Sequence, residues 1–228
     1  MTWEIITGDC LPWMRARESG SIDCVVTDPP YGIGEAAGKN KGRGLLAEPR
    51  DYGNEQWDND RLVLHVDTAR RIGREAVIFG GNYYADIFPP SSSWISWDKD
   101  NGGTDFADVE LAWTSHRRAA RRVKWRWNGM LQQPGAPRDR REHPTQKPVG
   151  VMLWIIENYT SPGETILDPF CGSGTTGVAC IRTGRNFIGI EINPEYADIA
   201  RRRCEEAERQ GDLFVKQPVA KPEQLVIK

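Results

Sequence analysis

The stretch Asp28-Pro29-Pro30-Tyr31 places a carboxylate, two prolines and an aromatic ring directly after an apolar run. That run, residues 22–27, is short and rich in valine and isoleucine, as buried strands are. Because proline restricts the backbone, the carboxylate and the carbonyl groups beside it are held in fixed positions. The turn therefore offers a preorganised hydrogen-bond acceptor next to a flat ring. The alternative is an ordinary strand-end turn capped by aspartate.

A second candidate site is the glycine-rich segment GSGTTG at residues 172–177, which follows the strand-like residues 165–167 and Asp168. Glycines allow the backbone to approach a ligand, and the helix that follows offers free amide donors. Glu191 lies 19 positions beyond Gly172, where a carboxylate can bind the hydroxyls of a ribose. This spacing fits the dinucleotide fingerprint, so a nicotinamide-dependent oxidoreductase is one interpretation.

Two features favour S-adenosylmethionine over a dinucleotide at this turn. Only 51 residues follow Gly177, which is too few to complete a doubly wound sheet in the usual order. Asp168 would also repel a pyrophosphate, whereas S-adenosylmethionine lacks a phosphate and carries an ammonium group that a carboxylate attracts.

The elements that must position these residues alternate between strand and helix. Expected strands are residues 3–6, 22–27, 76–79, 94–97, 109–114, 165–167 and 187–192; expected helices are residues 11–18, 62–72, 149–158, 175–182 and 194–209, the last capped by Asn193. This alternation predicts an α/β fold with a mostly parallel sheet and helices on both faces. Little helix separates residues 94–97 from 109–114, which predicts an antiparallel pair at a sheet edge.

The bulk composition is that of an ordinary globular protein. The 228 residues are 39% hydrophobic and 27% charged, which is enough for one domain with a real core. No run approaches the ~20 apolar residues of a membrane helix, and the N-terminus lacks a signal pattern, so export is not expected. The five cysteines are scattered without a CxxC pair, which favours buried thiols over zinc or disulfides.

Four blocks together resemble the amino-group DNA methyltransferases of the permuted β class. They are TGDC at residues 7–10, DPPYG at 28–32, HPTQKP at 143–148 and DPFCGSGTTG at 168–177. The catalytic block comes first, a target-recognition region follows and the cofactor half comes last, as in that family. The resemblance covers roughly residues 3–205 with a weak middle. It implies a circularly permuted, Rossmann-like S-adenosylmethionine-dependent methyltransferase fold with a small target-recognition insertion.

The resemblance also implies roles for individual residues. Asp28, Pro29, Pro30 and Tyr31 would be catalytic: the Asp28 carboxylate and the Pro29 carbonyl accept hydrogen bonds from the target amino group, and Tyr31 stacks on the flipped base. Lys147 would pair with the cofactor carboxylate, and Asp9 would contact the cofactor adenine or cap a helix. Gly177 is expected to allow close helix packing. The residues expected to bind the cofactor are Asp9, Cys10, Asp28, His143, Thr145, Lys147, Asp168, Phe170, Gly172, Gly174, Thr175 and Glu191.

A basic segment separates the catalytic and cofactor blocks. Between residues 115 and 147, ten lysines and arginines face only two acids, Asp139 and Glu142, which indicates contact with a polyanion or a solvated loop. The expected DNA contacts are Arg117, Arg118, Arg121, Arg122, Lys124 and Arg126. Trp125 and Trp127 alternate with two of these, as on a strand that buries its tryptophans at a sheet edge. The glycine-rich residues 32–58 are expected to form a mobile loop that closes on the base.

Four parts follow: a catalytic half (residues 1–116), a target-recognition segment (117–142), a cofactor half (143–211) and a tail (212–228). The activity that the resemblance implies is methyl transfer from S-adenosyl-L-methionine to N6 of adenine in double-stranded DNA, because in that family aspartate rather than serine at the head of the catalytic block indicates adenine. Cytosine-N4 methylation, RNA methylation, an oxidoreductase and an inactive DNA-binding module remain alternatives. No metal and no membrane partner is expected, a homodimer is left open, and the expected location is the cytoplasm of a bacterial or phage-infected cell.

Overall fold

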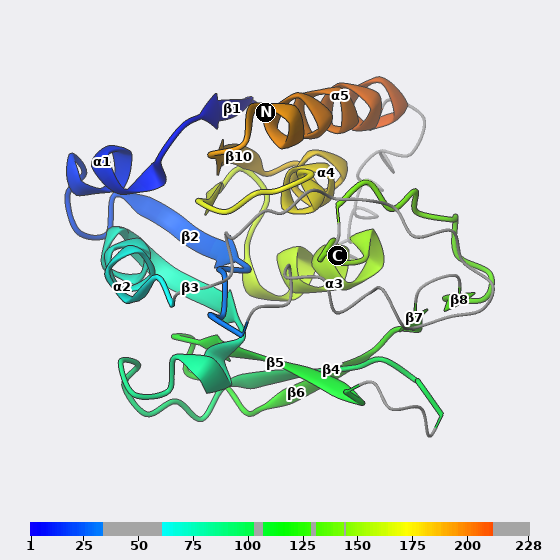
Figure 1. The fold of residues 1–228 in the computed structure, drawn as a ribbon, viewed down its shortest axis with the longest axis horizontal. Helices are drawn as coiled ribbons and strands as arrows, with labels where there is room; N and C mark the ends of the chain where they lie inside the picture. Colours follow the sequence, from blue (N-terminus) through cyan, green and yellow to red (C-terminus); the bar gives the residue numbers. More distant parts are fainter. Residues whose placement is uncertain (34–60, 103–106, 129–130, 144, 212–228) are drawn as a thin grey trace, which may run out of the picture.

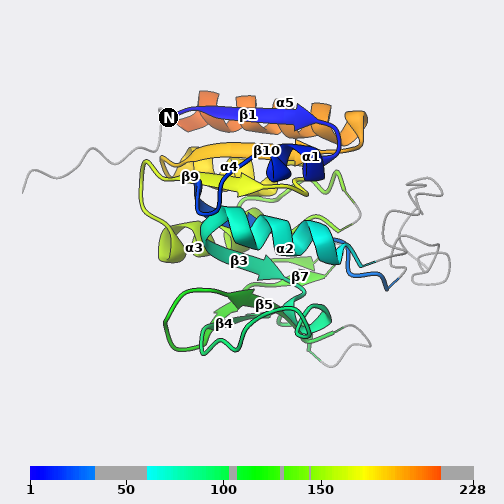
Figure 2. The same cartoon turned by 90° about the vertical axis from the view of Figure 1, so that its left-hand side faces the viewer.

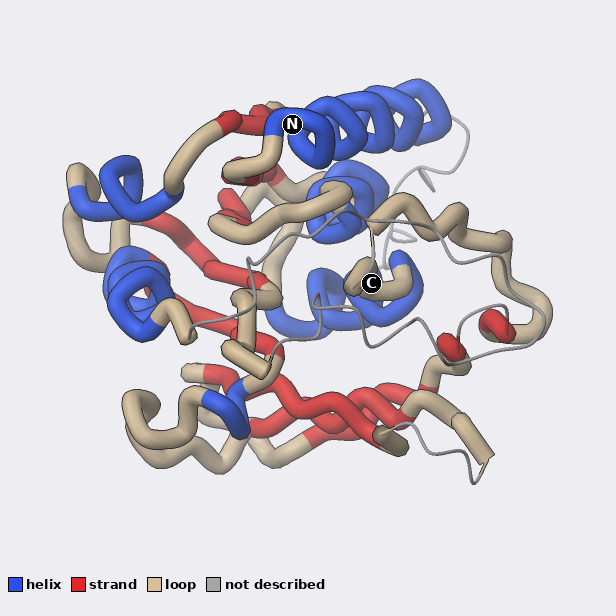
Figure 3. The backbone as a smooth tube through the Cα atoms, in the orientation of Figure 1, coloured by secondary structure: helices blue, strands red, loops and turns tan. Residues whose placement is uncertain are grey.

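The computed structural model describes residues 1–33, 61–102, 107–128, 131–143 and 145–211. An eight-stranded sheet with the order β1-β10-β9-β2-β3-β5-β4-β6 forms its centre and is drawn red in Figure 3. Its strands are β1 (Trp3–Thr7), β2 (Ile22–Thr27), β3 (Gly73–Phe79), β4 (Trp94–Asp98), β5 (Val109–Thr114), β6 (Arg121–Lys124), β9 (Thr165–Asp168) and β10 (Asn186–Glu191). The smaller elements are the 3-10 helix η2 (Gly81–Tyr83) and the paired strands β7 (Trp127–Asn128) and β8 (Leu131–Gln132).

Helices cover both faces of the sheet, as the sequence predicted. They are α1 (Cys10–Arg15), α2 (Val63–Ile72), α3 (Val149–Tyr159), α4 (Thr175–Arg182) and α5 (Pro194–Gly211). Figure 1 shows α1 and α2 on one side of the strands and α3, α4 and α5 on the other, and in Figure 2 α2 lies in front of β3. Met14 and Val66 belong to the apolar cluster on the first face, and Ile155, Val178 and Ala200 to the cluster on the second.

The two ends of the chain contribute neighbouring strands to the sheet. β2 pairs in parallel with β9, so that Cys24 lies opposite Ile166 and Val25 opposite Leu167. β1 pairs in parallel with β10 on the far side of β9. The short stretch that follows Gly177 therefore needs to supply only the end of α4, β10 and α5, and the N-terminal strands complete the sheet.

The antiparallel pair is confirmed, because β5 runs antiparallel to both β3 and β4. The pair does not form the edge, however, since β6 adds to β4 in parallel. The expected alternation through residues 124–127 is wrong in detail: β6 ends at Lys124, and the Trp97 indole donates to the Trp125 carbonyl at 2.9 Å. Trp125 and Trp127 nevertheless pack against the core.

Helix boundaries follow local chemistry. α1 ends at Arg15 rather than at residue 18, with Ala16 as its C-cap, and Gly20, with a φ of +68°, lies in the turn before β2. Pro148 is the residue directly before α3. The predicted cap of α5 is confirmed, since the Asn193 side chain accepts a hydrogen bond from the Glu195 amide at 2.8 Å.

The cysteines and the helices lie within the described residues, whereas most of the predicted loop and the predicted tail do not. All five cysteines are free and buried, as predicted. Among the described residues, no helix combines the length and the apolar character that a membrane crossing requires. The predicted closing loop, except for residues 32–33, and the predicted tail lie outside the described residues.

Gly177 allows α4 to pack closely on its neighbours. A Cβ atom at this position would lie 2.6 Å from the Phe187 ring and 2.8 Å from the Cys204 sulfur. We expect Gly177→Ala to lower the free energy of unfolding by about 1–3 kcal/mol, because overpacking outweighs the better helix propensity of alanine. Urea unfolding measures the change, and Arg182→Ala, exposed on the same helix, is the control. Equal stability of wild type and Gly177→Ala would contradict the packing role.

Candidate active site

The turn at residues 28–31, here called the catalytic turn, and the glycine-rich turn at residues 168–177 meet at the ends of two adjacent strands. Asp28 directly follows β2, and Asp168 is the last residue of the neighbouring parallel strand β9. The Thr27 hydroxyl donates a hydrogen bond to the Asp168 carboxylate at 2.7 Å, although 141 positions separate the two residues. Ligands of open α/β sheets bind beyond such strand ends, so this is the expected place for a site.

One cavity of about 470 Å³ joins the two turns. The residues expected at the site that line it are Asp9, Cys10, Asp28, Pro30, His143, Thr145, Lys147, Asp168, Phe170, Gly172, Thr175 and Glu191. Pro29, Tyr31 and Gly174 were also expected at the site but are not among the lining residues. The structure therefore gathers residues from all four sequence blocks around one cavity.

Asp168 places a buried carboxylate in the cavity wall. Its second oxygen accepts a hydrogen bond from the Thr176 hydroxyl at 2.5 Å, and the Phe170 amide lies 3.2 Å from the first. Burial raises the pKa of Asp168 to about 6, and the bonds from Thr176 and Thr27 limit the rise. The group is thus largely ionised at neutral pH, and its hydrogen-bond donors among the described residues are uncharged. Such a carboxylate favours a cationic ligand.

Glu191 fixes the glycine-rich turn. Its carboxylate accepts hydrogen bonds from the Gly172 amide at 2.8 Å and from the Asn193 amide at 2.9 Å. Gly172 adopts a φ of +50°, which favours glycine and brings the turn against the end of β10. Glu191 therefore lines the cavity and at the same time holds the Gly172 and Asn193 amides in place.

Gly174 has a packing role. It precedes α4 with a φ of +77°, and a Cβ atom there would lie 2.9 Å from the Cβ of Ala200. The absence of a side chain therefore permits α4 to approach α5. Contact of Gly174 with the cofactor stays a prediction.

The Asp28 carboxylate is held from two sides. One oxygen accepts a hydrogen bond from the Tyr31 hydroxyl, and the other pairs with the Lys147 ammonium. Burial raises the pKa of Asp28 above its ordinary value, while the Lys147 charge opposes the rise. The next residues are fixed too, because the Tyr84 hydroxyl donates to the Pro30 carbonyl.

Tyr31 lies beside the catalytic carboxylate with one face already covered. Its ring stacks on Tyr83 with centroids 4.9 Å apart and planes 19° apart. Gly80 lies against the Tyr31 ring so closely that a Cβ atom there would overlap it. Tyr31 and Tyr83 thus form a stacked pair of rings beside the Asp28 carboxylate.

Lys147 lies between two carboxylates of the chain itself. Its buried ammonium contacts Asp28 and, at 3.2 Å, Glu110. Burial disfavours the charge, yet the two carboxylates outweigh it and raise the pKa of Lys147 above its usual range. Lys147 also lines the cavity, and the expected pair with the cofactor carboxylate stays a prediction.

His143 forms an uncharged part of the wall. Burial lowers its pKa to about 4, and the charges of Lys147 and Arg141 act in the same direction. Its ring meets Tyr196 edge-on, with centroids 4.3 Å apart, and the Thr145 amide lies 3.3 Å from its Nδ1 atom. At neutral pH this imidazole therefore lines the cavity as an uncharged ring.

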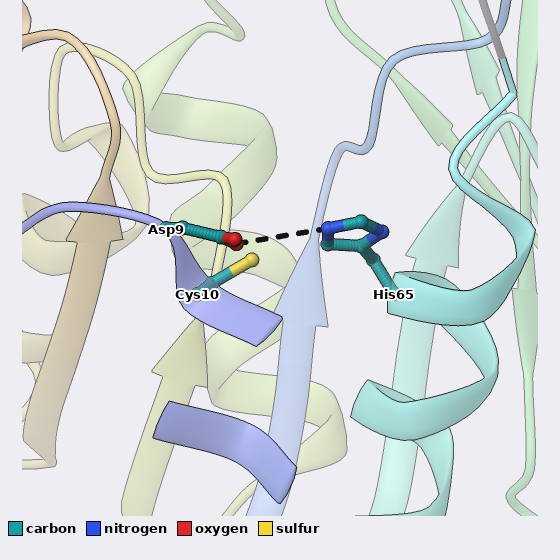
Figure 4. Close-up of side chains that lie close together, drawn as sticks. All are labelled: Asp9, Cys10 and His65. Atoms are coloured by element: carbon teal, nitrogen blue, oxygen red, sulfur yellow. Dashed lines mark ion pairs between the residues drawn. The ribbon is translucent and has the colours of Figure 1, made fainter. Parts of the chain in front are cut away.

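Asp9, Cys10 and His65 bring possible metal ligands within 4.8 Å of one another. Figure 4 shows Asp9 and His65 pointing toward each other, with 3.7 Å between carboxylate and ring nitrogen. Asp9 also caps α1, since it accepts from the Leu11 amide at 2.9 Å. Burial and the Asp9 charge raise the pKa of Cys10 to about 12, so the thiol keeps its proton. All three groups line the cavity.

The residues expected to contact DNA do not share one surface. Ser115 bonds to Ala76, and the Arg118 guanidinium donates to the Asn158 carbonyl near the end of α3, so Arg117 and Arg118 lie away from the Asp28 end of the sheet. β6 runs toward that end. Arg121 lies at the start of β6, and Arg122 is 3.9 Å from Asp98. Lys124 and Arg126 pair with Asp100 at 2.7 and 2.6 Å.

Sequence reasoning missed several residues of the site. Thr27 directly precedes the DPPYG block and Thr176 lies within the DPFCGSGTTG block, so these two hydroxyls were the easiest to find from the sequence. His65 and Tyr196 lie on helices without a motif, and no local signal marks them. Glu110 lies on β5 and its partner Lys99 directly follows β4, and alternating polar residues are ordinary on such strands.

The chain is similar to proteins of known family. A family model described as DNA methylase, covering N6 and N4 methyltransferases, matches residues 81–202. The type II methyltransferase M2.MboI of Moraxella bovis is 26% identical, over 90% of this chain and 88% of the relative.

Two solved structures are also similar. The complex of M1.HpyAVI with S-adenosylmethionine is 25% identical, with a TM-score of 0.57 over 89% of this chain and all of the other. The cytosine-N4-specific PvuII DNA methyltransferase is 16% identical, with a TM-score of 0.59 over 92% of each chain, and shares the fold.

Proposed function

The chain belongs to the N6/N4 DNA methylase family, and on that premise we propose that it methylates N6 of adenine in duplex DNA. At the coarser level it is an S-adenosylmethionine-dependent DNA amino-methyltransferase. The observation that carries the proposal is the Thr27–Asp168 hydrogen bond, which joins the catalytic turn to the cofactor turn in one cavity. Aspartate at the head of the catalytic turn supports adenine over cytosine through the family resemblance.

The cavity fits S-adenosyl-L-methionine. Its volume of about 470 Å³ suits a small cofactor, and its buried carboxylate suits a ligand with two positive groups. Asp168 would face those positive groups, Glu191 the ribose hydroxyls and Asp9 the adenine edge. The chemistry that this cofactor supplies when bound is a methyl group on a positively charged sulfur, which is a good leaving group.

The protein's own contribution is to present the target amine. The lone pair of an exocyclic amine is delocalised into its ring, and an acceptor for its N–H protons makes the nitrogen more nucleophilic. We assign this acceptor to the Asp28 carboxylate, with the Pro29 carbonyl as the second. Tyr31, backed by Tyr83, would stack on the base once it has left the duplex. Positioning of this kind needs no covalent intermediate on the enzyme.

DNA contacts are proposed for the part of the recognition segment nearest the cavity. Arg122, Lys124 and Arg126 lie on or just beyond β6, which runs toward the Asp28 end of the sheet. Their ion pairs with Asp98 and Asp100 would exchange for phosphate contacts. We also propose the division into a catalytic half (1–116), a recognition segment (117–142) and a cofactor half (143–211), and cytoplasmic action on bacterial or phage DNA.

Nucleoside mass spectrometry tests the proposed activity. Unmethylated duplex DNA is incubated with the protein and a donor whose methyl group carries deuterium, and is then digested to nucleosides. The expected product is labelled N6-methyladenine. Labelled N4-methylcytosine would overturn the adenine assignment and keep the family activity, and parallel duplex RNA separates the two nucleic acids.

A further inference from the structure

We propose that Glu110 is a positioning residue for methyl transfer, which holds Lys147 in place against the catalytic carboxylate Asp28. The inference rests on the proposed function, because it assigns a role within that same site. Glu110 lies on β5, which is separated from β2 by β3. It belongs to none of the four sequence blocks, and the cavity lining does not include it.

The geometry is a chain of alternating charges that starts at the surface and ends at the site. The Lys99 ammonium lies 2.6 Å from one oxygen of Glu110, and the other oxygen lies 3.2 Å from the Lys147 ammonium. Lys147 in turn contacts Asp28, and its side chain is only 10% exposed. Two ammonium groups and two carboxylates thus neutralise one another, which buried charges require.

The apolar surroundings make each partner necessary. The Lys147 ammonium lies 5.1 Å from the centre of the Phe79 ring and 5.9 Å from that of Tyr31. Aromatic faces stabilise a cation but do not replace a counter-ion. Burial raises the pKa of Glu110, but the charges of Lys147 and Lys99 outweigh burial and bring it below the usual value. Glu110 is therefore an anion under working conditions and shares the ammonium with Asp28.

Sharing matters because Asp28 must also accept from the substrate. One of its oxygens already takes the Tyr31 hydroxyl and the other the Lys147 ammonium, and each oxygen has two lone pairs. Without Glu110, the ammonium would be left with a single carboxylate and would compete with the target amine for it. With Glu110 on its other side, Lys147 orients Asp28 and leaves an acceptor position open.

Loss of the Glu110 charge is expected to shift the pH dependence of methyl transfer. The ionisable groups that face Asp28 are Tyr31 from its own turn, Lys147 from the segment before α3, Glu110 from β5 and Asp168 from β9. Loss of the Glu110 charge leaves a more positive surrounding, so Asp28 would ionise at lower pH. A merely structural defect would lower the rate without this displacement.

Glu110→Gln is the direct test. We expect kcat to fall about tenfold or more while the KM for the methyl donor stays within about threefold, because Glu110 does not line the cavity. The acid limb of the kcat/KM profile should move to lower pH. Glu110→Asp, which keeps the charge, should return the acid limb to the wild-type position, and Glu157→Gln, exposed on α3, is the control.

The kinetics of Glu110→Gln decide the inference. Unchanged kcat in Glu110→Gln, or a lower kcat with an unmoved acid limb, would overturn it. If that variant does not fold, Glu110→Gln/Lys99→Met restores neutrality and is measured for the same two quantities. If the wild-type protein methylates no DNA, the proposed function is overturned instead. This activity is measured before any variant is made.

Discussion

Asp28→Asn is expected to lose methyl transfer almost completely, with kcat lower by about 1000-fold or more. Asparagine keeps the shape of the side chain but removes the charge that draws protons of the target amine. It also places an amide donor where Tyr31 and Lys147 already donate. The rate loss should therefore exceed the effect of removing an ordinary hydrogen bond.

The same variant should still bind the methyl donor. Asp168 and Glu191 belong to the other turn, so the donor dissociation constant from calorimetry should change by no more than about threefold. Transfer of a tritiated methyl group to duplex DNA measures the rate, and Asp67→Asn, in an exposed ion pair on α2, is the control. Turnover of Asp28→Asn near the wild-type rate would remove this carboxylate from the reaction.

Glu191→Ala is expected to weaken donor binding by about 30-fold or more, which corresponds to roughly 2 kcal/mol. The substitution removes the acceptor for ribose hydroxyls and also leaves the Gly172 and Asn193 amides without their carboxylate. The glycine-rich turn then loses its fixed shape. Both effects act on binding, so kcat at saturating donor should change much less.

Calorimetry with the donor and with its demethylated product measures this loss directly. Glu195→Ala, exposed in the first turn of α5, is a control that changes charge near the site without touching the turn. A dissociation constant equal to that of the wild type would contradict the ribose role of Glu191. A stable variant that binds donor weakly and turns over normally at saturation would support it.

The parts of the fold that the sequence predicted are those set by local pattern. Residues 22–27 and 165–167 are apolar runs ended by an acid, and the glycines after Asp168 require a turn. Parallel pairing of β2 with β9 then follows, because the buried strands belong in the centre of the sheet. The convergence of Asp28 and Asp168 is a consequence of that order.

The parts that could not be predicted depend on contacts between distant segments. Lys147 lies in a recognisable block, but its partner Glu110 follows from the antiparallel placement of β5 beside β3. Likewise, the basic residues near 117 and near 124 form one cluster in sequence, whereas the direction of β6 places them at different ends of the sheet. Charge patterns predict that a segment is basic but not which way it faces.

Gly174 is a second residue whose surroundings depend on contacts between distant segments. The glycine spacing predicts a ligand turn, and two of its glycines have positive φ, yet only Gly172 lines the cavity. Contact between α4 and Ala200 explains the other. The motif therefore predicts the shape of the backbone, and the packing decides which of its residues line the cavity.

The most direct test of the account is a crystal structure of the protein with an unreactive analogue of the methyl donor and a duplex that contains its target. We predict the analogue in the cavity between Asp168 and Glu191, and an extruded adenine with its amino group at Asp28. An analogue bound elsewhere, for example in the cleft that includes Arg74 and Arg117, would contradict the account. So would a base held in the duplex away from Asp28.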